Sequence, residues 1–343
     1  MVNLKLKHQG AALITALITV FIVMAIVSNI AVKNYRVIRG LTNQKVKDQS
    51  YYILMSAVAL ARAGLATSGA TTQIDTLQDL WAQPIPKTEI VDGISMSGYV
   101  LDEQGKFNLN DLVNKGNVNT MAVEQFANLL SYINVPSSVA YNIAYYMASP
   151  NNQTNIMSLY TTADPPYRPA GRPMVDLSEL FLVKGVTSDM ITRMSPYITA
   201  IPVSLTYLLN ESAESSPAFT PESGSFPGGM LVNVNTAPAQ VIAARSGMPL
   251  PVAQRMVAAR TGTPFRSTTD ITNFLSSNGI IQSSNNPKAP SSVNLNALTT
   301  QSNYFTVHAM ADKGDYEFKW VALLYRPSRN GVSWPQVLWQ HPE

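Results

Sequence analysis

The sequence predicts an α+β protein in which one long N-terminal helix packs on an antiparallel sheet and a large all-helical segment interrupts that sheet. Three observations lead to this prediction. Residues 11–32 form an apolar run without a charged side chain. Strand patterns occur before residue 110 and return only after residue 304. The long stretch between them has helical patterns punctuated by Pro, Gly and Asn.

The apolar run has the length of a membrane-spanning helix. About 20 apolar residues cross a bilayer, and lipid forces such a segment to be helical because its backbone groups have no other partners. A secretory signal also begins with a basic leader, but its apolar core is only about 7–15 residues long. The run here is longer, and Val32 leads into Lys33 rather than into a small-x-small cleavage site. These features favour a retained anchor.

The helix is expected to continue beyond the membrane to about residue 66. Leu54 and Val58 lie on an apolar face with helical spacing, and the surrounding alanines favour helix. A separate amphipathic helix after Gly40 is the alternative. Strands are predicted at 94–101, from 107, at 304–310, at 316–325 and at 337–339, with turns at 102–105 and 312–315.

The middle of the chain contains a two-copy repeat. One unit opens with residues 107–110 and the other with residues 232–237, and both openings are rich in Asn. Each continues with a helix, a Pro turn, a second helix and an Asp before a short third helix. Residues 210–229 are polar and rich in Pro and Gly, so a loop is expected there.

Charge is unevenly distributed, although the net charge is only +3. Seven basic residues precede the first acid, Asp48, and five of them follow the apolar run: Lys33, Arg36, Arg39, Lys45 and Lys47. A positive-inside count alone would place the C-terminal bulk in the cytoplasm, but large domains translocate largely regardless of charge. The chain has no cysteine, which excludes disulfides and thiol chemistry.

No catalytic pattern is present in the sequence. The three histidines lack metal-pair spacing, and there is no phosphate loop, zinc-protease motif or nucleophile elbow. The sequence therefore predicts a protein that is not an enzyme.

The leader resembles that of type IV prepilins. Residues 7–10 read Lys-His-Gln-Gly and precede Ala11 at the start of the apolar run. The resemblance implies that prepilin peptidase cuts between Gly10 and Ala11 and that the new amino terminus is methylated. Most prepilins have Glu at the fifth mature position, where this chain has Thr15. That departure is typical of the minor pseudopilin K family of type II secretion systems.

Further phrases are similar to the same family, in the same order: residues 105–110, 172–180, 196–197, 233–237 and 264–265. The fold that this implies is a pilin-like body with an inserted helix-hairpin-helix (SAM-like) domain. The expected divisions are a leader at 1–10, a membrane part at 11–32, a β domain at 67–110 with 293–343, and the helical insertion at 111–292.

The resemblance implies a subunit at the tip of a short pseudopilus that helps to export folded proteins across the outer membrane. Its expected partners are other minor pseudopilins, which would contact the apolar helix face at Leu54 and Val58. The expected location is the inner membrane, with one span and a periplasmic C-terminal bulk. An uncharged Thr15 suits a terminal subunit, since a lone carboxylate at membrane depth costs about 2.5–3.5 kcal/mol and no amine of a higher subunit would pair with it.

Calcium is a further expectation from the family, because related pseudopilins bind it through acidic loops. One candidate cluster is Asp312, Asp315 and Glu317, and another is Glu211, Glu214 and Glu222. Calcium needs six to eight oxygen ligands, and a solvated acidic turn explains either cluster equally simply.

Two other functions stay open at this point. A membrane-anchored DNA receptor would use a helix-hairpin-helix with Arg245, Arg255, Arg260 and Arg266, which lie in an acid-free stretch. Pro249 and Pro251 remove amide donors from that hairpin, so nucleic acid is not expected as a partner. The equivalent minor pilin of a type IV pilus is the other alternative.

Overall fold

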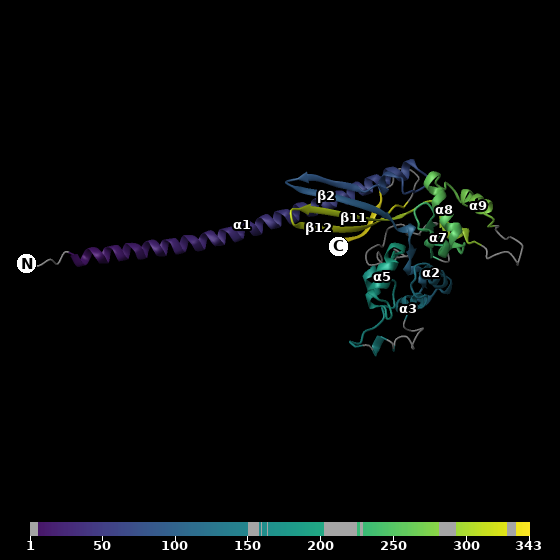
Figure 1. The fold of residues 1–343 in the computed structure, drawn as a ribbon, viewed down its shortest axis with the longest axis horizontal. Coiled ribbons are helices and arrows are strands. Elements are labelled where there is room, and N and C mark those ends of the chain that lie inside the picture. Colours follow the sequence, from purple (N-terminus) through teal and green to yellow (C-terminus); the bar gives the residue numbers. More distant parts are fainter. Residues whose placement is uncertain are drawn as a thin grey trace, which may run out of the picture.

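The computed structural model describes residues 6–149, 158, 160–162, 164–201, 225–226, 229–280, 293–327 and 334–343. Helix α1 (Leu6–Thr71) is 66 residues long and projects as a rod from a five-stranded sheet, and a lobe of short helices lies at the far end of the sheet (Figure 1). The α+β class with a long N-terminal helix and a helical insertion is thereby confirmed. The single continuous helix is also confirmed, and it ends five residues beyond its expected end.

The sheet has the strand order β1-β2-β11-β12-β13 and is antiparallel throughout. Its strands are β1 (Ile85–Val91), β2 (Ile94–Asp102), β11 (Tyr304–Lys313), β12 (Tyr316–Tyr325) and β13 (Gln336–Pro342). Strands β2 and β11 are neighbours although the whole helical insertion separates them in sequence, and their register runs from Asp102↔Phe305 to Ser95↔Asp312. The helical insertion therefore leaves the sheet at the end of β2 and returns to it at the start of β11, which lies beside that end.

One strand lies elsewhere than predicted, and one strand of the sheet was not predicted. The strand predicted from Phe107 does not join the sheet, because β3 (Phe107–Asn108) pairs in parallel with β6 (Ile198–Thr199) inside the lobe. The first strand, β1, was not predicted. It contains Pro86, which has no backbone N–H. An edge strand tolerates proline where the backbone faces solvent, because no neighbouring strand needs a donor there.

Helix α1 packs on one face of the sheet through the segment after Val46. The buried face comprises Ile53, Leu54, Ala57, Val58, Ala61 and Leu65. Two hairpin tips contact α1 where it leaves the sheet. Asp92, in the β1–β2 turn, pairs with Lys45 at 3.4 Å, and the Tyr316 hydroxyl lies 3.4 Å from the Asn43 amide oxygen. These contacts brace the rod at its base.

The lobe consists of two units of short helices around one apolar core. The first unit has α2 (Thr120–Tyr132), α3 (Ser138–Met147), η5 (Leu177–Leu182), α5 (Ser188–Met194) and η6 (Ser195–Tyr197), and the second has α7 (Ala239–Ser246), α8 (Leu250–Gly262) and α9 (Thr268–Ser277). Shorter described elements are η1 (Leu80–Ala82), η2 (Glu103–Gly105), η3 (Leu109–Leu112), β4 (Val113–Asn114), β5 (Asn117–Val118), β7 (Ser225–Phe226), β8 (Gly229–Met230), β9 (Val232–Asn233), η7 (Leu295–Ala297) and β10 (Leu298–Thr299).

The repeat is visible in how each unit closes. The first unit closes with the parallel pair β3–β6, and the second closes with the parallel pair β9–β10. In both pairs the opening strand ends in the first Asn of the repeated motif, Asn108 or Asn233. Both units thus have a parallel strand pair at the same place in the repeated motif.

Candidate functional site

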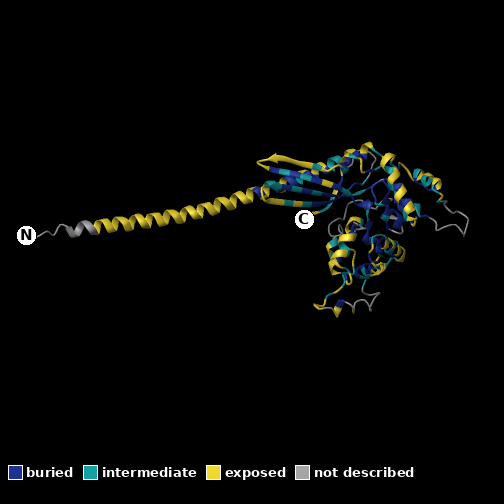
Figure 2. Ribbon diagram, viewed as in Figure 1, coloured by how far each residue is buried: buried dark blue, intermediate teal, exposed yellow. Residues whose placement is uncertain are grey.

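The membrane segment of α1 makes no contact with the rest of the protein. Residues 11–45 are exposed on every side, and Figure 2 shows the rod exposed up to the sheet. Within the described residues, α1 is the one helix long and apolar enough to cross a membrane. Since so large an apolar surface is unfavourable in water, this segment needs lipid or other apolar helices around it.

Thr15 has an internal partner in this segment. Its hydroxyl donates to the Ala12 carbonyl at 2.9 Å, and Thr19 donates to the Ala16 carbonyl at 2.8 Å. The hydroxyl at position 15 therefore needs no group from outside the helix. The Gly10–Ala11 bond lies within α1, and its cleavage stays a prediction.

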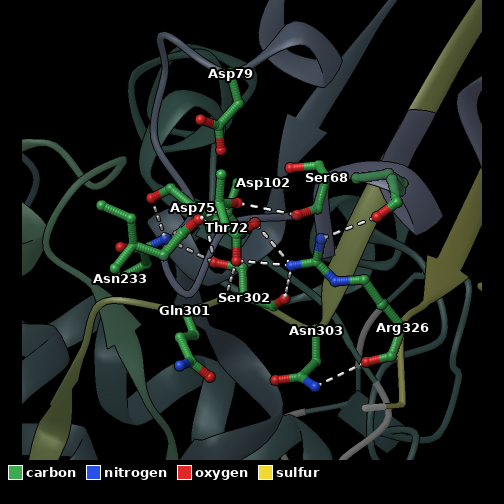
Figure 3. A network of polar contacts seen from close by, with 12 residues as sticks. Ser68, Thr72, Asp75, Asp79, Asp102, Asn233, Gln301, Ser302, Asn303 and Arg326 are labelled. Carbon is green, nitrogen blue, oxygen red and sulfur yellow. Dashed lines mark hydrogen bonds and ion pairs between the residues drawn. The ribbon is translucent and has the colours of Figure 1, made fainter. Parts of the chain in front are cut away.

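A buried ion pair joins α1, the sheet and the lobe at their common corner (Figure 3). Arg326 follows β12, and its Nη2 donates to both carboxylate oxygens of Asp75 at 2.7 Å. The same guanidinium donates to the Ser302 carbonyl at 2.7 Å and to the Leu65 carbonyl near the end of α1 at 3.2 Å. Because Arg326 and Asp75 are almost fully buried, removing either partner would leave an uncompensated charge in the interior.

Asp102, at the end of β2, extends this network into the lobe. Its Oδ2 accepts hydrogen bonds from the hydroxyls of Ser302 and Thr236, both at 2.6 Å, and from the Asn233 amide at 3.2 Å. Its Oδ1 accepts the Gln104 N–H at 2.9 Å. Burial raises the pKa of Asp102, and these hydrogen bonds oppose that rise. One carboxylate thus connects the last residue of β2, the entry to β11 and the second helical unit.

The second Asn of each repeated motif has the same structural role in both units. Asn110 accepts the Met174 N–H at 2.7 Å and donates to the Met174 carbonyl at 2.9 Å. Asn235 does the same with Phe265, at 2.9 and 2.8 Å. Each amide satisfies a buried backbone N–H and C=O in the segment before the third helix of its unit, where an unpaired group would be costly.

A second buried ion pair links the two units. Arg245 of α7 donates to Asp111 at 2.9 Å, to the Met230 carbonyl at 2.9 Å and to Gln125 of α2 at 2.9 Å. Burial raises the pKa of Asp111 to about 6 and lowers the pKa of Arg245, because both charged forms lose water. A Cβ at Gly229 would lie 2.0 Å from an Asp111 oxygen, so only glycine fits beside this pair.

Comparisons with known proteins agree with this architecture. Two family models described as type II secretion system protein K match residues 105–203 and 232–294. Protein K of Pseudomonas aeruginosa is 28% identical over 286 residues, which cover 79% of this chain and 78% of that protein. Protein K of Aeromonas hydrophila is 26% identical over 57% of this chain and 64% of that protein.

The chain belongs to the type II secretion system protein K family.

A solved structure supports the fold of this protein K chain independently. It comes from the GspK-GspI-GspJ complex of enterotoxigenic Escherichia coli and aligns with a TM-score of 0.65 at 18% identity, covering 88% of this chain and 98% of that one. Membership of the family makes the chain a minor pseudopilin of type II secretion. The DNA-receptor alternative is not favoured.

Two of the four arginines that a DNA receptor would use are held by contacts within the lobe. Arg245 is buried in its ion pair, and Arg260 donates to the carbonyls of Val234 and Ala237 from a half-buried position. Arg255 donates to Asn278 at 2.7 Å. The four arginines therefore do not form one exposed basic face, and the sequence could not show this because spacing along a helix does not reveal which face another element covers.

The expectation that Leu54 and Val58 contact neighbouring subunits was also wrong. Leu54 is 3% exposed and Val58 is 4% exposed, because both pack on the chain's own sheet. The same apolar stripe on α1 would suit packing on the chain's own sheet or on a helix of another subunit, so the sequence periodicity cannot distinguish these two partners. Elsewhere on this part of α1, Tyr52 and Leu60 are more than half exposed.

The structure does not bring Asp312, Asp315 and Glu317 together as a metal site. Asp312 pairs with Lys87 at 3.1 Å and Glu317 with Lys319 at 3.4 Å, while Asp315 lies in the turn between β11 and β12. Within the described ranges, no group of three His, Asp or Glu side chains could hold a metal ion. The second candidate cluster, Glu211, Glu214 and Glu222, lies outside the described residues, and calcium binding stays a prediction.

Proposed function

We propose that this chain caps the tip of a type II secretion pseudopilus, as a structural subunit rather than an enzyme. The observation that carries the proposal is the combination of a free apolar rod with a bulky lobe at its other end (Figure 1). A globule of about 180 residues has a radius of gyration near 16 Å. Such bulk would be crowded at every level of a thin fibre but not at its end.

Thr15 supports the terminal position. In the resembled family, the usual Glu at this position offsets the positive amino terminus of the adjacent subunit. Thr15 is neutral, and its hydroxyl is bonded within its own helix. A subunit with no neighbour above it has no amine to neutralise, so a carboxylate there would only add the cost of an unpaired charge at membrane depth.

The proposed partners are other minor pseudopilins. A solved neighbour in fold comes from a GspK-GspI-GspJ complex, and the exposed side chains of Tyr52 and Leu60 on α1 are available for helix contacts. The proposed location is the inner membrane, with α1 as a single span and the sheet and lobe in the periplasm. Before assembly, prepilin peptidase would cut between Gly10 and Ala11, and the new amino terminus would be methylated.

Two measurements test the proposal. Intact mass of the chain isolated from membranes should correspond to a product that begins with methylated Ala11, and a mass that includes Met1 would contradict processing. Gold-labelled antibody against the lobe should mark one end of overproduced pseudopili. Labels spaced along the whole fibre would contradict the terminal position even if processing occurs.

A further inference from the structure

We propose that Lys33, Arg36 and Arg39 form a basic collar on α1 that binds the phosphate headgroups of anionic phospholipids. The lipids would be those of the leaflet next to the folded body. This inference rests on the anchoring part of the proposed function and does not depend on the position in the pseudopilus. It assigns a partner to a charged segment that the packing of the protein leaves unused.

The depth of the collar follows from helix geometry. At 1.5 Å per residue, the 22 residues from Ala11 to Val32 span about 33 Å, which is close to the hydrocarbon thickness of about 30 Å. Lys33 therefore comes directly after the apolar layer, and Arg39 lies only about 9 Å farther along the helix. The headgroup layer is about 5–8 Å thick on each side, so Lys33 and Arg36 fall within it. The long side chain of Arg39 can reach back to it along the lipid boundary.

The three side chains are close to each other and free to bind. They follow one another at intervals of three residues, so at 100° per residue they spread over about a third of the helix circumference. All three are exposed, and no ion pair found in the described parts of the chain includes any of them. The first acidic residue after the apolar run is Asp48. No carboxylate of α1 competes with phosphate at this depth.

Tyr35 is an independent indication that this turn lies at the membrane interface. Its side chain is 65% exposed and lies between Lys33 and Arg36 in the sequence. Tyrosine is enriched at both surfaces of bilayers, where its ring contacts the lipid boundary and its hydroxyl contacts water. An exposed aromatic ring with basic neighbours is the side-chain combination expected at a headgroup layer.

Lys45 and Lys47 provide an internal comparison. They lie about 18–21 Å beyond Lys33 on the same helix, outside the headgroup layer, and Lys45 is already paired with Asp92. The first buried residue of the body, Val46, lies between them. These two lysines carry the same kind of charge but belong to the base of the folded body.

The collar also gives the three basic residues directly after the span a role that is compatible with a body outside the cytoplasm. Each Lys or Arg near an anionic surface strengthens binding about fivefold. Those charges would then hold the span at a defined depth from the body side. Long basic side chains reach such headgroups easily, since their apolar stems can lie along the lipid boundary.

The test uses the full chain reconstituted in bilayers that contain equal amounts of phosphatidylglycerol and phosphatidylcholine. Spin-labelled lipids measure the association of each with the protein by electron spin resonance. The wild type should prefer phosphatidylglycerol by about fivefold or more, and 0.5 M NaCl should reduce this preference because salt screens exposed charges. The K33Q/R36Q/R39Q variant should lose the preference, whereas R36K/R39K and K45Q/K47Q should keep it.

Each alternative outcome is distinct. Equal association of both lipids with the wild type, or an equal loss in K45Q/K47Q, would overturn the collar. Competition by 10 mM inorganic phosphate would show a free-anion site instead of a lipid site. Loss of co-purification with other pseudopilins in the triple variant, without any lipid preference in the wild type, would assign the charges to a protein partner. Failure of the wild type to enter bilayers would instead contradict the anchor itself.

Discussion

Arg326 and Asp75 are separated by 251 positions, yet one guanidinium nitrogen donates to both carboxylate oxygens at 2.7 Å. Asp75 follows the end of α1, and Arg326 follows the end of β12. The pair therefore fastens the end of the long helix to the sheet at the corner where the lobe is attached.

Replacing Arg326 by Met should strongly destabilise the protein. The variant keeps an apolar stem against Phe305, over whose ring the guanidinium lies at 4.8 Å, but leaves Asp75 buried without its cation. We expect a loss of about 3–5 kcal/mol, measured by denaturant unfolding of the detergent-solubilised full chain. R193Q removes an exposed arginine that pairs with Asp189, and it should cost less than about 1 kcal/mol.

A double-variant cycle separates the ion pair from packing effects. D75N/R326M should lose less stability than the sum of the two single variants, because the double variant leaves no unpaired charge. Additive losses would mean that the two groups act independently.

Gly69 and Gly64 should respond oppositely to alanine. A Cβ at Gly69 would lie 3.1 Å from Cδ and 3.3 Å from Nη1 of Arg326, whereas a Cβ at Gly64 would meet nothing within 4 Å. G64A should raise the free energy of unfolding by about 0.5–1 kcal/mol through helix propensity. G69A should lower it, because the guanidinium is already held by Asp75 and cannot move away. Equal gains in the two variants would show that the arginine adapts freely.

Leu54 and Leu60 distinguish the chain's own core from the exposed side of the helix. L54A removes a side chain that is 3% exposed and should cost about 2–5 kcal/mol. L60A removes one that is 53% exposed and should change stability by less than about 0.5 kcal/mol. Thermal unfolding of both variants measures the difference. A small effect of L54A would contradict the packing of α1 on the sheet.

The Asp111–Arg245 pair should make stability depend on pH. The folded-state pKa of Asp111 is about 6, above the ordinary value of 3.8, so the folded protein binds this proton more readily than the unfolded chain. Its favourable contribution is complete below pH 4 and is lost as the pH rises to about 6, a change of roughly 2–3 kcal/mol. D111N should be less stable overall but should lack this decline.

Unfolding midpoints between pH 4 and pH 7.5 check this prediction. D189N, which removes the exposed carboxylate of the Arg193 pair, should keep the wild-type pH profile. An unchanged slope in D111N would assign the pH dependence to another group, with the buried Asp102, whose pKa is also raised, as the next to replace.

Local pattern predicted most helices and the long strands, since each depends on neighbours in the sequence. Strands β11 and β12 begin at their predicted first residues, Tyr304 and Tyr316. Strand β1 was missed because its exposed, Pro-containing sequence has no alternating pattern. The strand predicted at Phe107 was misplaced because a short apolar segment can pair in the body or in the lobe, and the partner Ile198 lies far along the chain.

The sequence by itself determined the anchor, the continuous helix, the α+β class and the Asn-rich repeat, because charge, hydrophobic period and turn residues act over short distances. Only the tertiary structure decided that Leu54 and Val58 belong to the chain's own core, that Arg245 is buried, and that Asp75 meets Arg326. Those outcomes depend on which surfaces meet after folding, and side chains of one chemistry suit several partners equally. The fold selects the partner by bringing distant segments to one corner.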